Sequence, residues 1–282
     1  MKNYIPDYLA IGPEHLGKGQ PVKIRILKDM TTLADDMARA MLDCIRQARD
    51  EGRRPTLIVP VGPVDQFPLL ARRVNEERLS LRDVLFINMD EYLTDNDEWI
   101  PREHPLSFRA FMDRQFYDLL DPALAPSAEH RVFPDPKDLG SVGRTIARRG
   151  GVDATFGGIG INGHIAFNEP PESGETCSVE AFADRATRVL DVARETRAIN
   201  SVTVGGELSA VPRRCVTVGM REILASRRLH FYCNRPWQSG VVRGALHGPL
   251  TPACPASYLR THPDAALTIA EYVAAKPDIR LR

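Results

Sequence analysis

Short apolar runs alternate along the chain with segments whose apolar residues recur at helical spacing. The run PTLIVPV at 55–61 is continuously apolar, which is typical of a strand covered on both faces. Further strands are predicted at 22–27, 84–88, 152–156, 188–192, 215–218, 229–233 and 266–269. Helices are predicted at 33–48, 67–74, 107–120, 142–149, 220–226 and 236–246.

The first helix has recognisable ends. Thr32 is its predicted N-cap, with Asp35 three residues later, and Gly52 is placed to end it. Strands and helices alternate throughout, with no internal repeat, low-complexity tract or linker. The pattern therefore predicts one α/β domain over residues 1–282, a Rossmann-like open and mostly parallel sheet with helices on both faces.

Composition narrows the class of protein. The 282 residues are 43% hydrophobic and 26% charged, as in ordinary globular proteins, and Lys plus Arg equals Asp plus Glu at 37 each. A formal net charge of zero argues against a nucleic-acid binder or an anionic-membrane binder. No apolar run is long enough to cross a bilayer, and the first residues lack a continuous apolar stretch, so a secretory signal is not expected there. The five cysteines have no CxxC spacing, so we expect neither a metal site nor a disulfide framework, and a cytoplasmic location.

The stretch GGIGINGHIAFNEP at 157–170 follows a predicted strand end and is dense in glycine. Glycine permits close approach of the backbone to a ligand, and open α/β sheets bind ligands at such strand ends. His164 and Glu169 in this stretch form a proton-transfer pair if the carboxylate orients the imidazole. The alternative is a glycine-rich turn with a surface histidine. Candidate substrate contacts are Gly62, Glu91, Gly158, Gly160 and Gly163.

Asp90 and Glu91 directly follow the strand predicted at 84–88. Neighbouring residues of a strand point to opposite faces, so only one of the two carboxylates is expected to face a crevice. A solvated loop or a helix cap is the alternative. The turn after the strand at 55–61 contains Gly62 but no Ser, Thr or Lys, so a plain strand-to-helix turn is favoured there over a phosphate site.

Two motifs carry a resemblance to a known family. NMDEY at 88–92, followed by HPLSFRAFM at 104–112, precedes GHIAFNEP at 163–170, and TRAINS and VPRRCVTVGM follow at 196–201 and 211–220. From residue 55 onward the chain resembles the glucosamine-6-phosphate deaminase (isomerase) family, which belongs to a larger group with the 6-phosphogluconolactonases. The resemblance implies Asp90 as the enolisation base, His164 as the ring-opening acid/base and Glu169 as its orienting partner.

The chain also departs from that family. Asn162 stands where the family has a third ring-opening carboxylate, and an amide can orient an imidazole but supplies no charge. The family's phosphate-binding positions correspond to the turn at 61–64, to Val202 and to a position near Gln238, with Arg235 or Arg243 as substitutes. These changes predict a substrate that is not held through a standard 6-phosphate.

The sequence therefore predicts an aldose–ketose isomerase or deaminase for an amino sugar or a related sugar, using Asp90, His164 and Glu169, with Asn162 as a helper. No metal or organic cofactor is implied, and the resemblance suggests a homo-oligomer. A sugar lactonase and a catalytically inactive sugar-binding module are the alternatives.

Overall fold

A seven-stranded sheet lies at the centre of the computed structural model, which describes residues 5–63 and 65–280. Its strand order is β1-β10-β9-β6-β2-β3-β5, and every neighbouring pair is parallel. The strands are β1 (Lys23–Leu27), β2 (Thr56–Val59), β3 (Leu85–Asn88), β5 (Arg131–Val132), β6 (Ala154–Gly157), β9 (Leu229–Cys233) and β10 (Ala265–Ala270). At the centre, Ile58 pairs with Ile87 on one side and with Thr155 on the other.

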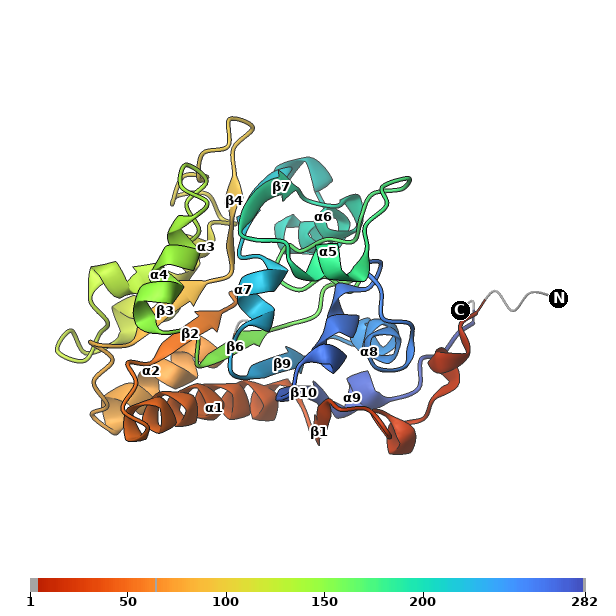
Figure 1. Ribbon diagram of the computed structural model, residues 1–282, viewed down its shortest axis with the longest axis horizontal. Helices are drawn as coiled ribbons and strands as arrows, with labels where there is room; N and C mark the ends of the chain where they lie inside the picture. Colours follow the sequence, from red (N-terminus) through yellow and green to blue (C-terminus); the bar gives the residue numbers. More distant parts are fainter. Residues whose placement is uncertain (1–4, 64, 281–282) are drawn as a thin grey trace.

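Helices lie on both sides of this sheet, as predicted. α1 and α2 run together below it in Figure 1, and α4 and α7 lie above it. The α-helices are α1 (Met30–Asp50), α2 (Gln66–Glu76), α3 (Phe108–Gln115), α4 (Ser141–Arg149), α5 (Val179–Ala183), α6 (Arg194–Asn200), α7 (Met220–Leu224), α8 (Gln238–His247) and α9 (Glu271–Ala274). Short 3-10 helices are η1 (Asp7–Ala10), η2 (Pro13–His15), η3 (Tyr117–Leu119), η4 (Ala128–His130), η5 (Ser201–Val204), η6 (Leu208–Ala210) and η7 (Pro255–Thr261). The predicted α/β class is confirmed.

Several helix boundaries differ from the prediction by a few residues, and two of them involve identifiable contacts. Asp29 is the N-cap of α1, because its carboxylate accepts a hydrogen bond from the backbone N–H of Thr32 at 2.8 Å. The helix predicted at 107–120 ends at Gln115, where Phe116 leaves helical geometry with φ −137° and ψ −68°. The Phe116 ring packs in the core 5.4 Å from the ring of Phe67, and the short 3-10 helix η3 follows.

A second sheet, which the pattern did not predict as a separate unit, stands at the carboxyl edge of the first. It is antiparallel and consists of β4 (Asp90–Leu93), β8 (Arg214–Thr217) and β7 (Arg188–Asp191). β4 continues from β3 after Met89, and the backbone N–H of Val218 donates to the Met89 carbonyl at 2.7 Å. The small sheet therefore rises from the edge where the parallel strands end, at the top of Figure 1.

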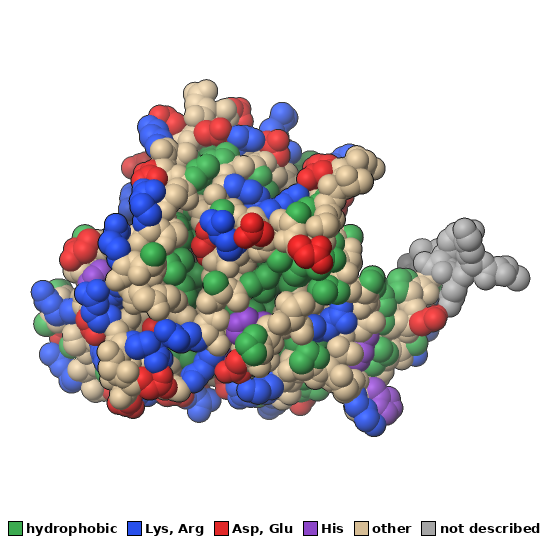
Figure 2. Space-filling view, viewed as in Figure 1, with side chains coloured by type: hydrophobic (Ala, Val, Ile, Leu, Met, Phe, Trp, Pro, Cys, Tyr) green, Lys and Arg blue, Asp and Glu red, His purple; other side chains and the backbone are tan. Residues whose placement is uncertain are grey.

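Two hydrophobic cores correspond to the two sheets. The larger one surrounds the parallel sheet, and the smaller one contains Tyr92, Ile100, Phe167, Val192, Val211 and Cys215. On the surface, positive and negative side chains are interspersed across the face seen in Figure 2, as expected for zero net charge. Within residues 5–63 and 65–280, no helix combines the length and the apolar character needed to span a bilayer.

Candidate active site

A cavity of about 460 Å³ opens at the carboxyl edge of the parallel sheet. Four loops that follow the adjacent strands β9, β6, β2 and β3 contribute to its lining, and the carboxyl ends of parallel strands necessarily share one edge. The segment after β9 supplies residues 235, 237 and 238, and the loop after β6 supplies residues 158–160. The loop after β2 supplies residues 60–63, and the segment after β3 supplies residues 89 and 90. α3 and its leading loop, α6 and η5 add residues 105–108, 111, 200 and 203 to the wall, and residues 92, 164, 166, 167 and 232 also line the cavity.

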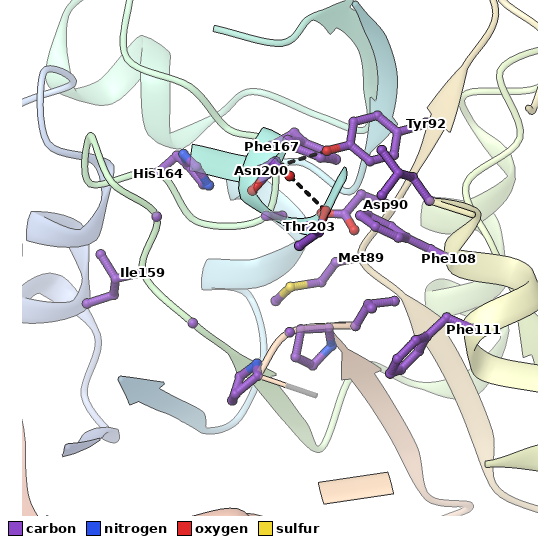
Figure 3. Close-up of a pocket in the computed structure, with 18 of the residues that line it drawn as sticks. Met89, Asp90, Tyr92, Phe108, Phe111, Ile159, His164, Phe167, Asn200 and Thr203 are labelled. Carbon is purple, nitrogen blue, oxygen red and sulfur yellow. Dashed lines mark hydrogen bonds between the residues drawn. The ribbon is translucent and has the colours of Figure 1, made fainter. Parts of the chain in front are cut away.

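Asp90 is the first residue of β4, and its carboxyl group points into this cavity (Figure 3). It is only 7% exposed, and within the part of the chain that the structure describes no group donates a hydrogen bond to it. Burial, reinforced by the negative charge of Glu91, raises the pKa of Asp90 to about 8. An ionisable carboxyl group with a pKa near neutrality, aimed into a cavity, is suited to proton transfer.

Glu91 points away from the cavity, as the alternation along a strand requires. Its fully buried carboxylate accepts hydrogen bonds from the backbone N–H groups of Phe108 at 3.0 Å and Arg109 at 2.9 Å. The Arg109 guanidinium adds an ion pair at 3.2 Å. Glu91 therefore fixes the start of α3, and the structure does not place it among the residues that line the cavity.

His164 lies across the cavity from Asp90, on the loop after β6 (Figure 3). Its Nδ1 atom is surrounded by three oxygens: Asn162 Oδ1 at 2.7 Å, Thr196 Oγ1 at 3.1 Å and Glu169 Oε2 at 3.2 Å. Two of these oxygens only accept hydrogen bonds, so Nδ1 carries the proton. The other ring nitrogen, Nε2, is left as the free acceptor.

Asn162 links His164 to Glu169. Its Nδ2 atom donates to Glu169 Oε2 at 2.8 Å, and this contact turns Oδ1 toward the imidazole, because a carboxylate can only accept. Burial opposes ionisation of Glu169, but the charge of His164 and the hydrogen bonds from His164, Asn162 and Thr196 outweigh it and lower the pKa of Glu169. A charged carboxylate therefore stands behind the imidazole and holds its orientation.

The glycines of this loop have two distinct roles. A Cβ on Gly160 would lie 2.0 Å from Nε2 of His164, so only glycine leaves room for the imidazole. Gly163 has φ +87°, a conformation that favours glycine, and a Cβ there would lie 2.8 Å from Cys254 Sγ. Gly62, Gly158 and Gly160 line the cavity, whereas Gly163 supports the loop from outside it.

The structure thus brings most of the predicted residues together. Asp90 and His164 line one cavity, and Asn162 and Glu169 stand directly behind His164. Thr196 was not predicted as a partner of His164, and it is buried beside the ring. The TRAINS segment contains it and was the available signal.

Three other polar residues of the site were also not predicted. Asn200 donates from Nδ2 to the hydroxyl of Tyr92 at 2.8 Å, and the hydroxyl of Thr203 donates to the Asn200 carbonyl at 2.7 Å (Figure 3). All three line the cavity. Asn200 also belongs to the TRAINS segment, whereas Tyr92 and Thr203 come from β4 and η5 and are aligned only by the tertiary fold.

The positions that the sequence predicted as counterparts of a phosphate clamp carry little positive charge. Val202 is 70% exposed and does not line the cavity. Gln238 lines it, but its amide donates to the Ile159 carbonyl at 2.7 Å and accepts from the Arg235 backbone N–H at 2.7 Å. Arg243 is fully buried and donates to backbone carbonyls, including those of Ile11 and Ala274. Among the described residues, Arg235 is the single Lys or Arg that lines the cavity.

Within residues 5–63 and 65–280 there is also no cluster of three or more His, Cys, Asp or Glu side chains arranged to hold a metal ion. The cavity itself presents the carboxyl group of Asp90 and the oriented imidazole of His164. Such a pair can move protons at two different atoms of one small molecule.

Comparison with known proteins places the chain in a family. No protein-family model matches the chain. It is 31% identical over 263 residues to the glucosamine-6-phosphate deaminase of Cellvibrio japonicus, covering 90% of this chain and 91% of that protein. It is 28% identical over 267 residues to the glucosamine-6-phosphate deaminase of Rhodopirellula baltica, covering 92% and 97% respectively.

Solved structures agree at the level of the fold. A monomeric glucosamine-6-phosphate deaminase matches with a TM-score of 0.77 and 24% identity, covering 91% of this chain and all of that one. A 6-phosphogluconolactonase from Thermotoga maritima matches with a TM-score of 0.64 and 15% identity, covering 89% of this chain and all of that one. The chain thus has the α/β fold that these proteins share. By its identity to the Cellvibrio japonicus protein, it belongs to the glucosamine-6-phosphate deaminase family.

Proposed function

We propose that this protein is an aldose–ketose isomerase that acts on an amino sugar or a related sugar and releases ammonia where C2 carries the amine. The observation that carries the proposal is that Asp90 and His164 face one cavity from opposite sides. An aldose–ketose shift needs one acid/base for the ring oxygen and a second for a carbon-bound proton, and the cavity offers one of each.

Ring opening is assigned to His164. Its Nδ1–H is held by Asn162 and Glu169, so Nε2 accepts the proton of the anomeric hydroxyl and a protonated imidazole returns a proton to the ring oxygen. Glu169 stabilises the imidazolium through the ion pair at 3.2 Å. The products of this step are the open-chain aldehyde and the original state of the histidine.

Enolisation is assigned to Asp90. The ionised carboxylate removes the proton from C2 while the C2 ammonium group gives a proton to the aldehyde oxygen, which yields an enolamine. From a sugar with a C2 hydroxyl, protonated His164 gives that proton, the product is an enediol, and the C2 hydroxyl returns the proton to His164 as the ketone forms. Asp90 then delivers its proton to C1. From an amino sugar the result is an imine at C2, and water adds there and displaces ammonia, leaving the ketose. One water is consumed and one ammonia released for each sugar.

The charge of the cavity supports an amino sugar as the substrate. The pKa of Asp90, raised to about 8 by burial and by Glu91, keeps this carboxyl group protonated at neutral pH in the empty cavity. An ammonium group on C2 would stabilise the ionised carboxylate, since an opposite charge within about 4–6 Å lowers the pKa of an acid. A phosphate dianion would have Arg235 as its one cationic side chain in the described lining, so we propose that no standard 6-phosphate anchors the substrate.

A product assay tests this proposal. The purified protein is incubated with free and 6-phosphorylated amino sugars and with a sugar lactone, and ammonia, ketose and acid are measured. We expect ammonia and ketose in equal amounts from at least one amino sugar. Acid release from the lactone without isomerisation would favour a lactonase, and sugar binding without any product would favour a sensing module.

A further inference from the structure

The cavity is chemically uneven. His164, Asn200, Thr203, Tyr92 and Asp90 lie along its upper part in Figure 3 and present its acid/base and hydrogen-bonding groups. Met89 and Phe111 lie below them in the same view. Six apolar side chains also line the cavity and are called the apolar wall below: Val61, Pro63, Met89, Leu106, Phe108 and Phe111. The lining residue Ser107 lies between two of them in sequence, and its hydroxyl donates to the buried Glu91 carboxylate.

This apolar wall is built rigidly. Met89 is 2% exposed and lies between the two sheets, where its backbone carbonyl accepts from Val218. Phe108 packs against Tyr92 with ring centroids 5.0 Å apart and stacks on Phe167 at 6.1 Å. The buried carboxylate of Glu91 fixes the start of α3, which carries Phe108 and Phe111.

Positive charge is scarce around this wall. Arg235 is the one Lys or Arg among the described lining residues, and it is exposed, so its guanidinium remains hydrated. Its neighbour Gln238 uses both ends of its amide on the backbone. A charged group pressed against these apolar side chains would lose its hydration without gaining several charge-assisted hydrogen bonds.

The geometry points to a subsite at Val61, Met89, Phe108 and Phe111 that receives an apolar, uncharged end of the sugar, remote from C1 and C2. The substrate class is a 2-amino-2,6-dideoxyhexose, in which a methyl group stands where related substrates carry a phosphorylated hydroxymethyl group. This inference rests on the proposed function, because it takes Asp90 and His164 to be the groups that hold the C1–C2 end.

A methyl group suits the wall better than the alternatives. Burying it removes apolar surface from water on both partners, whereas a hydroxyl against the same side chains would lose a hydrogen bond to water with no replacement. A difference of one such group in an apolar pocket commonly changes specificity about tenfold or more. A phosphate would be disfavoured further by its charge.

Binding of unreactive analogues tests the subsite directly. The open-chain alditols of the 6-deoxy amino sugar, of the parent amino sugar and of its 6-phosphate lack the aldehyde and cannot be turned over. Their dissociation constants are measured by titration calorimetry with the wild-type protein. We expect the 6-deoxy alditol to bind about tenfold more tightly than the parent and more tightly still than the phosphate. Equal or tighter binding of the phosphate, or no binding of any alditol, would overturn the inference.

A charge placed in the wall provides a second test. Phe111→Lys puts an ammonium group in the subsite, and we expect it to reverse the preference in favour of the phosphorylated alditol. Leu119→Lys is the matched control, because Leu119 is 45% exposed on the adjoining η3 and does not line the cavity. The control should keep the wild-type preference, and thermal melting confirms that each variant is folded. An unchanged preference in folded Phe111→Lys would contradict the subsite.

The two proposals fail separately. Tight binding of the 6-deoxy alditol without ammonia or ketose from the 6-deoxy sugar would leave the subsite standing and remove the isomerase function. Turnover of a 6-phosphorylated amino sugar in preference to its 6-deoxy counterpart would leave the isomerase function standing and remove the subsite.

Discussion

Oδ1 of Asn162 lies 2.7 Å from Nδ1 of His164, while Nδ2 of the same amide lies 2.8 Å from Oε2 of Glu169. One neutral side chain therefore orients both the imidazole and the carboxylate behind it. Its place in the loop keeps a single negative charge, that of Glu169, next to His164. A carboxylate at 162 would face Glu169 at hydrogen-bonding distance, and two such groups share a proton or stabilise an imidazolium between them.

The Asn162→Asp variant is therefore expected to shift the pH profile of kcat. A second carboxylate next to Glu169 raises the pKa of one member of the pair, so the acidic limb of the profile, which reports ionisation of Glu169, should move to higher pH by about one unit. Asn162→Ala serves as the control, because it removes the orienting amide and adds no charge. This control variant should lower kcat without shifting the pH profile of kcat to higher pH. Superimposable profiles for wild type and Asn162→Asp would contradict this role of Asn162.

Gly160→Ala is expected to impair catalysis while the protein remains folded. The added Cβ would lie 2.0 Å from Nε2 of His164, so the imidazole must move, and misplacing a catalytic group by about 1 Å can reduce the rate about a hundredfold. Gly158→Ala is the matched control for Gly160→Ala. A Cβ at this position would lie 3.5 Å from its nearest atom, the Tyr232 carbonyl oxygen, which is an ordinary van der Waals contact. The measurement is kcat for both variants. A loss in Gly160→Ala no greater than that in Gly158→Ala would refute the close packing of this ring.

Glu91→Gln is expected to destabilise the protein more than it changes the chemistry. Glu91 is buried with hydrogen bonds from the start of α3 and an ion pair with Arg109, and removing one partner of such a pair costs about 3–5 kcal/mol. Urea denaturation measures the loss. Glu98→Gln is the comparison, since the ion pair of Glu98 with Lys137 is exposed and worth roughly 0–1 kcal/mol. Equal stability changes in the two variants would argue against the structural role of Glu91.

Much of this architecture could be predicted because local pattern and tertiary position agree. β2 is a buried central strand, and its continuous apolar run predicted it. His164 and Asp90 could be paired from the sequence, because both lie just after predicted strands, and parallel strands end at one edge. The alternation of side chains along β4 correctly placed Asp90 and Glu91 on opposite faces.

The other features of the structure could not be predicted, because they depend on tertiary contacts that leave no local pattern in the sequence. β4, β7 and β8 are four residues long and carry charged side chains, so their periodicity did not distinguish an antiparallel sheet from loops or parallel strands. Asp29 replaced Thr32 as the cap of α1, because several polar residues at the helix start could serve. Arg243 is close in sequence to residues that line the cavity. Its guanidinium nevertheless donates to the carbonyls of Ile11 and Ala274, which only the tertiary fold brings near it.

Asp90→Asn is expected to become more stable relative to wild type as the pH rises. The pKa of Asp90 is about 8 in the folded protein and about 3.9 in an unfolded chain, so between these values the folded state holds a proton that the unfolded state releases. The contribution of this neutral carboxyl group to the wild-type free energy of unfolding is fully present below pH 4, and it is lost as the pH rises through 8. Asparagine stays neutral, so the difference in free energy of unfolding should grow by roughly 1.4 kcal/mol per pH unit in that window. A difference independent of pH would contradict the raised pKa.

The central claim is that Asp90 carries the proton of a sugar opened by His164 in the same cavity. The direct measurement is deuterium incorporation from heavy water into C2 of the amino sugar and C1 of the ketose, followed by NMR. We predict incorporation with wild type and with Asp95→Asn, an exposed control in the next loop, and a loss of about a hundredfold or more with Asp90→Asn while the alditol still binds. Incorporation by Asp90→Asn at the wild-type rate would contradict the account.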